Sequence, residues 1–209
     1  MKSRFSAEGF EVRPSTKNTS WTWSLMLTGY SYGERIQPVS PVQPYVDQNR
    51  IEYRRGNLVE QYVNDHRGVH QGFTIAVAPT MRSTRSLLEV HLATQGNLKP
   101  ALGQDRTGIT WVNDSGSAVL NYSGLRAWDV QGKTLRAQMA LTANGIVLIV
   151  EDSLAQYPVT IDSFTQLAKL TASDGSQSDS FGTTVAIDSN TILVGATGAK
   201  IGAAYVYGK

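Results

Sequence analysis

The stretch FTQLAKLTASDGSQSDSFGTTVAIDSNTILVGATGAKIGAAYVYGK, from Phe164 to Lys209, carries the clearest structural pattern in the chain. It holds four short apolar runs, each bounded by Gly, Asp, Ser or Asn, which are residues that favour tight turns. Short strands joined by such turns are typical of an antiparallel meander. We therefore predict one small four-stranded sheet, with strands at 167–171, 183–187, 192–196 and 203–207.

This predicted sheet has glycines at its strand edges and apolar side chains on its faces. Gly182 and Gly195 fall at strand edges, where a missing side chain permits a bulge or the close approach of a neighbouring backbone. Phe181, Val185 and Ile187 are expected to pack on one face of the sheet. Tyr205 and Tyr207 share one face of the last strand because side chains alternate along a strand. A sheet this small leaves both faces uncovered, so we expect it to pack against neighbours or to self-associate.

The same stretch resembles an FG-GAP repeat, the blade unit of integrin-alpha-type β-propellers and a common unit of large bacterial surface and secreted proteins. Phe181-Gly182 stands where the family has FG, and Gly195-Ala196-Thr197 stands where it has GAP, with Thr197 replacing the proline. The lead-in KLTASDG at 169–175 and the closing GAAYVY at 202–207 also match. The resemblance implies a single propeller blade. Because repeat architectures need about three units for stability, it predicts a fragment of a longer repeat protein.

The chain before Phe164 shows strand patterning throughout. Trp21, Trp23, Leu25 and Leu27 alternate with polar or smaller residues, which predicts that both indoles are buried rather than stacked on a sugar. No stretch has a sustained helical period, and turn signals recur about every ten residues, which favours a two-sheet sandwich. The predicted fold class is all-β, with an antiparallel β-sandwich over 1–163 followed by the single four-stranded blade over 164–209.

Several hairpins are expected within the sandwich. Asn144-Gly145 is the strongest hairpin signal in the chain, since this dipeptide favours two-residue turns. Separate strands are predicted at 119–122 and 125–128, and a turn is predicted at 130–133.

A second resemblance covers part of the sandwich. The segment NRIEYRRGNLVEQYVNDHRGVHQGFTIAVAP at 49–79 resembles a β-rich domain that commonly precedes FG-GAP repeats in bacterial proteins, and YPVTID at 157–162 extends the resemblance. That domain has no assigned activity. The two resemblances together imply an extracellular or cell-surface protein with a role in adhesion, recognition or scaffolding.

Composition narrows the classes of partner. The formal net charge is +2 with acidic and basic residues interspersed, which gives no electrostatic footprint for nucleic acid or an anionic membrane. The absence of cysteine excludes disulfides, thiolate metal sites and cysteine nucleophiles. Residues 1–14 lack an apolar signal core of roughly 7–15 residues, and no run approaches the ~20 residues of a membrane-spanning helix. We expect a protein or glycan ligand, no nucleic acid and no membrane insertion.

No catalytic residue is predicted. His66 and His70 are placed in a turn, where they share no helical face, and His91 is expected to be a solvated surface residue beside Glu89. The chain lacks G-x-S-x-G and the phosphate-binding glycine patterns. Carboxylates that could form a glycosidase pair are no more frequent than in other β-proteins: Glu52, Glu60, Asp65, Glu151 and Asp152. The alternatives to a binding module are a carbohydrate-active or other hydrolase and a structural spacer.

No cofactor is expected, and calcium is the one metal to weigh. Many FG-GAP propellers carry a D-x-D-x-D-G loop, which this sequence lacks. Asp174 and Asp179 supply only two carboxylates, whereas calcium takes about 6–8 oxygen ligands. Capping of local backbone amides explains both aspartates more simply, and they remain weak candidates for a Ca²⁺ site.

Overall fold

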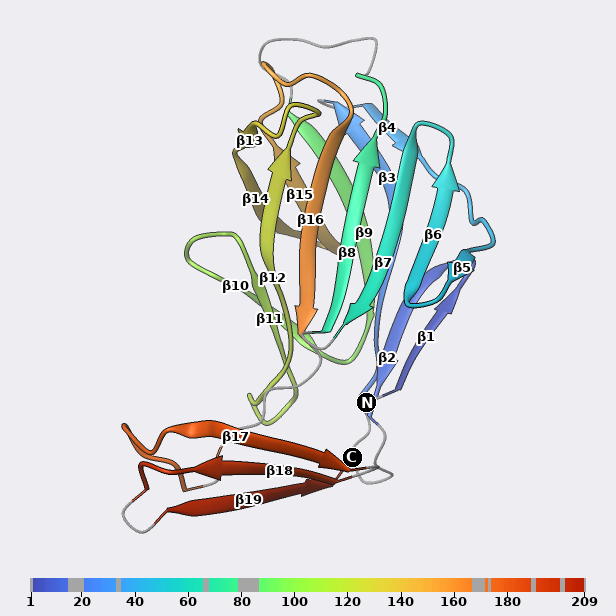
Figure 1. The fold of residues 1–209 in the computed structure, drawn as a ribbon. Coiled ribbons are helices and arrows are strands. Elements are labelled where there is room, and N and C mark those ends of the chain that lie inside the picture. The colour runs from blue at the N-terminus through green and yellow to red at the C-terminus, as the bar shows by residue number, and fades with distance from the viewer. Residues whose placement is uncertain are drawn as a thin grey trace. The chain divides into compact units, whose positions relative to one another are not determined.

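The structure is a computed structural model that describes residues 2–14, 21–32, 35–65, 68–78, 87–166, 172, 174–188, 191–199 and 202–208. Every regular element in these ranges is a strand, and the strands pair antiparallel in three sheets (Figure 1). The chain divides into two compact units, Lys2–Leu167 and Ala168–Lys209. Each unit is described by itself.

Sheet A belongs to the first unit. Its strand order is β1-β2-β3-β9-β15-β14. Strand β4 pairs with the Gly29–Tyr32 end of β3, on the same edge that β2 occupies at Trp23–Leu25. The long central pair β3 and β9 runs in register from Trp23 opposite Gly96 to Tyr32 opposite Leu88, with one irregularity after Leu27. The strands are β1 Lys2–Ser6, β2 Gly9–Arg13, β3 Trp23–Tyr32, β4 Arg35–Pro38, β9 Leu88–Gly96, β14 Ala137–Thr142 and β15 Gly145–Val150.

Sheet B completes the first unit. Its order is β10-β11-β12-β16-β8-β7-β6-β5, and β13 pairs with β12. The neighbours β12, β16 and β8 are far apart in sequence, so this sheet is held together by long-range pairing. The strands are β5 Tyr45–Asp47, β6 Arg50–Arg55, β7 Leu58–Asp65, β8 Gly68–Ile75, β10 Lys99–Leu102, β11 Ile109–Val112, β12 Ala118–Trp128, β13 Thr134–Leu135 and β16 Val159–Gln166.

Sheets A and B face each other across a shared apolar core (Figure 1). Trp23 of sheet A contacts Trp111 of sheet B with ring centroids 5.5 Å apart, and Phe10 of sheet A lies 5.5 Å from Tyr62 of sheet B. Trp21, Trp23, Leu25 and Leu27 are all buried, so the burial predicted from their alternation is confirmed. Period-two patterning placed one face of β3 in the core because successive side chains point to opposite faces of a sheet.

A fully buried polar network crosses the inner face of sheet B. The Arg55 guanidinium forms an ion pair with Glu60 at 2.8 Å, and the exposed fractions of these side chains are 5% and 0%. Both the Tyr62 hydroxyl and the Gln71 amide donate to the other Glu60 oxygen, at 2.8 and 3.0 Å. The Glu60 carboxylate is therefore surrounded by three donors.

The network continues from Gln71 towards β12 and β16. The Tyr122 hydroxyl donates to Gln71 at 2.9 Å, and the Ser163 hydroxyl donates to the Tyr122 oxygen at 2.6 Å. Burial raises the pKa of both Tyr122 and Tyr62, so both phenols remain neutral donors. Because every contact satisfies a buried polar atom, this network holds five strands of sheet B together.

Several local expectations are corrected by the strand assignments. The two strands predicted at 119–122 and 125–128 are one strand, β12, whose pairing with β16 shifts between Ser123 and Arg126. Gly124 lies in this bulge with a φ of 70°, a conformation that glycine adopts readily. At the hairpin predicted for Asn144-Gly145, the two turn residues are Ala143 and Asn144, and Gly145 already begins β15 opposite Thr142. Strand β16 continues through Phe164 to Gln166, so the first unit ends four residues beyond the boundary expected after 163.

The second unit contains a three-stranded sheet within its described residues, in the order β17-β18-β19. The strands are β17 Phe181–Asp188, β18 Thr191–Ala196 and β19 Ala203–Gly208, in place of the strands predicted at 183–187, 192–196 and 203–207. The further strand predicted at 167–171 lies outside the described residues. The antiparallel meander is therefore confirmed for three of the predicted strands.

The Asp129 carboxylate stabilises the turn after β12 by accepting backbone hydrogen bonds. One carboxylate oxygen accepts from the backbone N–H groups of Gln131 and Lys133, both at 3.0 Å, and the other accepts from the N–H of Gln156 at 3.1 Å. These bonds, that from Gln156 foremost, lower the pKa of Asp129 below the ordinary value of 3.8. A lowered pKa in the folded protein means that the ionised carboxylate stabilises the fold.

We expect Asp129→Asn to destabilise the protein at neutral pH and to have little effect in strong acid. The stabilisation from Asp129 is present above the unfolded pKa and is lost as the pH falls through the lower folded pKa. Urea unfolding of both proteins between pH 7 and pH 2 measures this difference. The control is Asp114→Asn, since that side chain is 79% exposed and forms a surface ion pair with Lys99 at 3.2 Å. A destabilisation by Asp129→Asn that is constant over this range contradicts the prediction.

Candidate functional site

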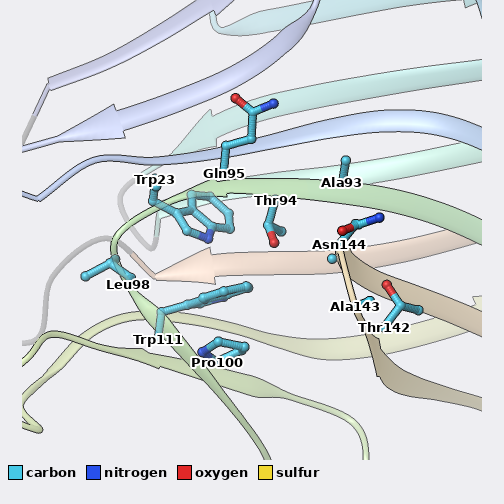
Figure 2. A pocket seen from close by; sticks show the side chains of 12 residues that line it. Trp23, Ala93, Thr94, Gln95, Leu98, Pro100, Trp111, Thr142, Ala143 and Asn144 are labelled. Carbon is cyan, nitrogen blue, oxygen red and sulfur yellow. The ribbon is translucent and has the colours of Figure 1, made fainter.

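A hollow in the first unit lies where β3, β9 and the β14–β15 turn of sheet A approach β10 and β11 of sheet B. Its volume is about 430 Å³. We call it the tryptophan pocket, because Trp23 and Trp111 both line it. Figure 2 shows these two side chains, with Leu98 and Pro100, across the hollow from Asn144 and Thr142.

The two indoles form the floor of the tryptophan pocket. Their exposed fractions are 1% for Trp23 and 2% for Trp111, and their rings cross at 61°. Both Nε1 atoms are buried, and neither has a hydrogen-bond acceptor among the residues that the structure describes. Figure 2 shows the Trp23 nitrogen directed towards the space between the two rings. Buried polar groups without a partner are uncommon and call for an explanation.

The rim of the pocket is polar and exposed. Thr142 and Asn144 are exposed there, and Thr94 is half-buried beside them. The exposed Gln95 side chain points away from the hollow (Figure 2). Pro100 adds an exposed apolar surface opposite Thr142 and Asn144. All of the lining residues are described, and none of them carries a charge. The pocket therefore offers neutral donors and acceptors above an aromatic floor.

Two glycines allow the walls of the pocket to approach closely. Gly96 pairs with Trp23 and has a φ of 122°, and a Cβ there would collide with the carbonyl oxygen of Thr22. Gly145 pairs with Ala93, and a Cβ there would collide with the carbonyl oxygen of Leu92. Sequence reasoning assigned Gly145 to a turn, whereas its role is to admit the backbone of β9.

The residues of the FG-GAP signature lie on the sheet of the second unit. The pairing of β17 with β18 shifts between Phe181 and Thr184, and Gly182 lies within this bulge with a φ of 93°. A Cβ on Gly195 would collide with the Thr184 hydroxyl, so the close approach at this glycine is to a side chain and not to the neighbouring backbone that the sequence predicted. Ala196 is fully buried, and the Thr197 hydroxyl donates to that of Thr183 at 3.3 Å.

The aromatic side of this sheet is also as expected. The Phe181 ring packs against Tyr205 and Tyr207, with centroids 5.3 and 6.3 Å apart. These contacts place both tyrosines on one face, as the alternation predicted.

Asp174 and Asp179 make separate contacts. Asp174 accepts a hydrogen bond from the Tyr205 hydroxyl at 2.8 Å, which is the main cause of a raised pKa for that phenol. Asp179 accepts from the backbone N–H of Ser176 at 2.6 Å and from the Ser176 hydroxyl at 3.0 Å. No group of three or more potential metal ligands occurs within the described ranges. The local capping expected of these aspartates is thus present at Asp179.

The surroundings of His91 and His70 differ from those that the sequence predicted. His91 lies on the outer face of β9, but its side chain is only 19% exposed, and its Nε2 lies 2.8 Å from the Ser31 hydroxyl. Glu89 lies 3.4 Å from the same nitrogen. A catalytic triad needs the acid at the other ring nitrogen, so these three side chains lack that geometry.

His70 was placed in a turn by the sequence, and the structure places it within β8. Its ring packs on Phe164 of β16 with centroids 4.9 Å apart. The two rings border a second hollow, of about 350 Å³, with the ion pair of Arg126 and Asp162 at 3.8 Å. His66 lies outside the described residues.

The carboxylates considered for a glycosidase pair do not gather at the tryptophan pocket. Glu60 is buried on the inner face of sheet B, while Glu52 lies on the outer face between Arg50 and Arg54. Asp152 is buried and accepts from the Tyr157 hydroxyl at 2.7 Å, and burial raises its pKa. The exposed Glu151 faces Arg136 at 3.6 Å, and the side chain of Asp65 lies outside the described residues.

Comparison with known proteins identifies one family. Residues 164–207 match the FG-GAP repeat. The match covers the whole sheet of the second unit except its last residue, together with the end of β16. No curated protein and no solved structure matches the chain. Within the described residues, no helix is long and apolar enough to span a membrane.

Proposed function

We propose that this chain is a non-enzymatic binding module of an extracellular or cell-surface protein, with the tryptophan pocket as its ligand site. The observation that carries the proposal is the neutral, polar-rimmed cavity between the two sheets, in a chain that also contains an FG-GAP repeat. FG-GAP repeats are typically found in extracellular binding and adhesion proteins. Concave sites with a few polar groups above an apolar floor are the usual form of small-molecule sites.

A hydrolase of carbohydrates is the second candidate, and the arrangement of acids weighs against it. General acid catalysis on a glycosidic bond needs two carboxyl groups facing one substrate, about 5–10 Å apart. The residues lining the tryptophan pocket include no carboxylate. A structural spacer is the third candidate, and it predicts that no ligand binds.

The experiment that tests the proposed function is a glycan array and a panel of immobilised proteins, read alongside a panel of hydrolase substrates. The binding module predicts saturable binding of at least one ligand without turnover. Turnover that a single carboxylate substitution abolishes would replace this proposal with the hydrolase. No binding on either panel would favour the spacer.

The second unit fits the role of a propeller blade in a longer, bacterial-type repeat protein. Ala186, Leu193 and Val206 lie opposite one another across its three strands. The exposed fractions of Leu193 and Val206 are 43% and 69%, so this face presents an apolar stripe. In a propeller such a face packs against the next blade. In the isolated chain it is a surface for self-association.

Deleting Ala168–Lys209 is expected to leave the first unit folded and to reduce self-association. Strand β16 supplies a central partner to β8 and β12, so the cut must follow Leu167 rather than residue 163. We expect the thermal midpoint of the first unit to be unchanged and the truncated protein to sediment as a monomer.

The matched control for this deletion keeps the full chain and carries Val206→Lys. This change should reduce self-association to the same degree, because it places a charge in the apolar stripe. A truncated protein that loses cooperative unfolding would show that the second unit completes the core of the first.

A further inference from the structure

Three polar side chains meet on the outer face of sheet A, and none of them lines the tryptophan pocket. Ser31 of β3 lies directly opposite Glu89 of β9, and His91 shares the face of Glu89 because alternate residues of a strand point to the same side. The cross-strand partner of His91 is Gly29, which has no side chain to separate the imidazole from Ser31. The pairing of β3 with β9 therefore gathers a hydroxyl, a carboxylate and an imidazole. We call Ser31, Glu89 and His91 the His91 cluster.

The polar atoms of the His91 cluster converge. The His91 Nε2 atom lies 2.8 Å from the Ser31 oxygen and 3.4 Å from the Glu89 Oε2 atom. A charge-assisted hydrogen bond from an imidazole to a carboxylate is about 2.7–2.9 Å long, so Glu89 and His91 do not form one. Two ligand atoms about 2.0–2.2 Å from a tetrahedral zinc ion are about 3.3–3.5 Å from each other. The separation between the imidazole nitrogen and the carboxylate oxygen therefore fits two ligands of one such ion.

The two ligand side chains can be reached from solvent. The side chains of His91 and Glu89 are 19% and 30% exposed, whereas Ser31 is buried. The Ser31 hydroxyl donates to Glu89 Oε2 at 3.3 Å and so holds the carboxylate near the imidazole. An ion that arrives from solvent would lie on the side of the pair opposite to Ser31, where water can fill its remaining coordination positions.

The surroundings leave the negative charge of Glu89 open to a cation. The cross-strand neighbours of the cluster on the two flanking strands are apolar: Ile36 of β4, and Val147 and Ile149 of β15. Within the part of the chain that the structure describes, Glu89 forms an ion pair with His91 and with no lysine or arginine. Apolar neighbours exclude water and strengthen the attraction between a carboxylate and a cation.

The donor set selects the kind of cation. A neutral imidazole nitrogen and a carboxylate oxygen are ligands that Zn²⁺ takes in proteins, whereas Mg²⁺ and Ca²⁺ prefer sites built from oxygen atoms alone. We propose that the His91 cluster binds a Zn²⁺ ion through His91 Nε2 and Glu89 Oε2, with water completing the coordination. This site goes beyond the proposed function, because it lies on the outer face of sheet A and does not depend on the tryptophan pocket.

The test is a calorimetric titration of the full chain with zinc chloride and, separately, with magnesium chloride. We expect Zn²⁺ to bind saturably and Mg²⁺ not to bind, because Mg²⁺ takes oxygen ligands. His91→Gln and Glu89→Gln each remove one ligand and should weaken Zn²⁺ binding by more than about tenfold, the loss that even a residue outside the ligand shell causes. His70→Gln and Glu151→Gln are the matched controls, since His70 lies on sheet B and Glu151 faces Arg136. Both controls should bind Zn²⁺ as the unchanged protein does.

Three results would overturn the zinc proposal: Zn²⁺ does not bind the folded protein saturably, Mg²⁺ binds as tightly as Zn²⁺, or His91→Gln and Glu89→Gln bind Zn²⁺ as the controls do. Loss of Zn²⁺ binding in His70→Gln would place the ion elsewhere and would overturn the proposal too. If His91→Gln fails to fold, as judged by circular dichroism, Glu89→Gln decides alone, because it keeps the shape of a partly exposed side chain. None of these results bears on the binding module, since no residue of the cluster lines the tryptophan pocket.

Discussion

Replacing Glu60 by alanine should lower the free energy of unfolding by about 3–5 kcal/mol, the cost of leaving one member of a buried ion pair without its partner. The Arg55 side chain is 5% exposed, so its charge cannot turn to water when the carboxylate is removed. Tyr62 and Gln71 lose their acceptor in the same step. Urea unfolding at pH 7, with the slope compared between variants, measures the loss.

The matched control is Glu52→Ala on the neighbouring strand. Glu52 also pairs with arginines, at 2.7 Å for Arg54, but the Arg54 side chain is 69% exposed. Exposed ion pairs contribute about 0–1 kcal/mol, so the control should cost little. Equal costs for the two alanine variants would show that the Glu60 network does not stabilise the sheet. The double variant Arg55→Met with Glu60→Leu should recover part of the loss, since it removes both charges together.

Trp23→Ala should also cost about 3–5 kcal/mol, because large-to-small substitutions in a packed core lose the buried surface and leave a cavity. The ring packs against Phe10 and Trp111, with centroids 6.2 and 5.5 Å away. It also belongs to the central strand of sheet A, so a shift here affects both neighbouring strands. Thermal unfolding followed by circular dichroism gives the change in midpoint.

Trp128→Ala is the control for residue type, because Trp128 lies at the end of β12 and is only half-buried. Trp128→Ala should lower the free energy of unfolding clearly less than Trp23→Ala does. If Trp23→Ala costs less than about 1 kcal/mol, the floor of the tryptophan pocket is not a packed part of the core.

Much of the local structure could be predicted from the sequence. The alternation of Trp21, Trp23, Leu25 and Leu27 predicted their burial, and a bulge of the kind expected at the strand-edge glycines is present at Gly182. These patterns are local, since they depend on the two-residue period of a strand and on the freedom of glycine. The resemblance of the closing stretch to an FG-GAP repeat agrees with the family match over 164–207.

Such local patterns could not predict the candidate site. Trp111 received no role in the sequence, and Gly145 received a different one. No local signal brings Trp111 beside Trp23, because their strands belong to different sheets. Glu60 looked like one carboxylate among many until its pairing with Arg55 was seen. The sequence predicted a solvated His91 because alternation shows only on which face of the sheet a side chain lies. It does not show that Ser31 lies within hydrogen-bond distance of His91 on that face.

The sequence by itself determined that this chain is built of strands, that Trp21, Trp23, Leu25 and Leu27 are buried, and that its closing stretch matches an FG-GAP repeat. Only the tertiary structure decided which strands are neighbours. That pairing brings together the residues of the Glu60 network and of the tryptophan pocket. The physical reason is the range of the interactions. A strand's pattern is set by its own residues, whereas the order β12-β16-β8 and the meeting of β3 with β11 are set by how two whole sheets share one core.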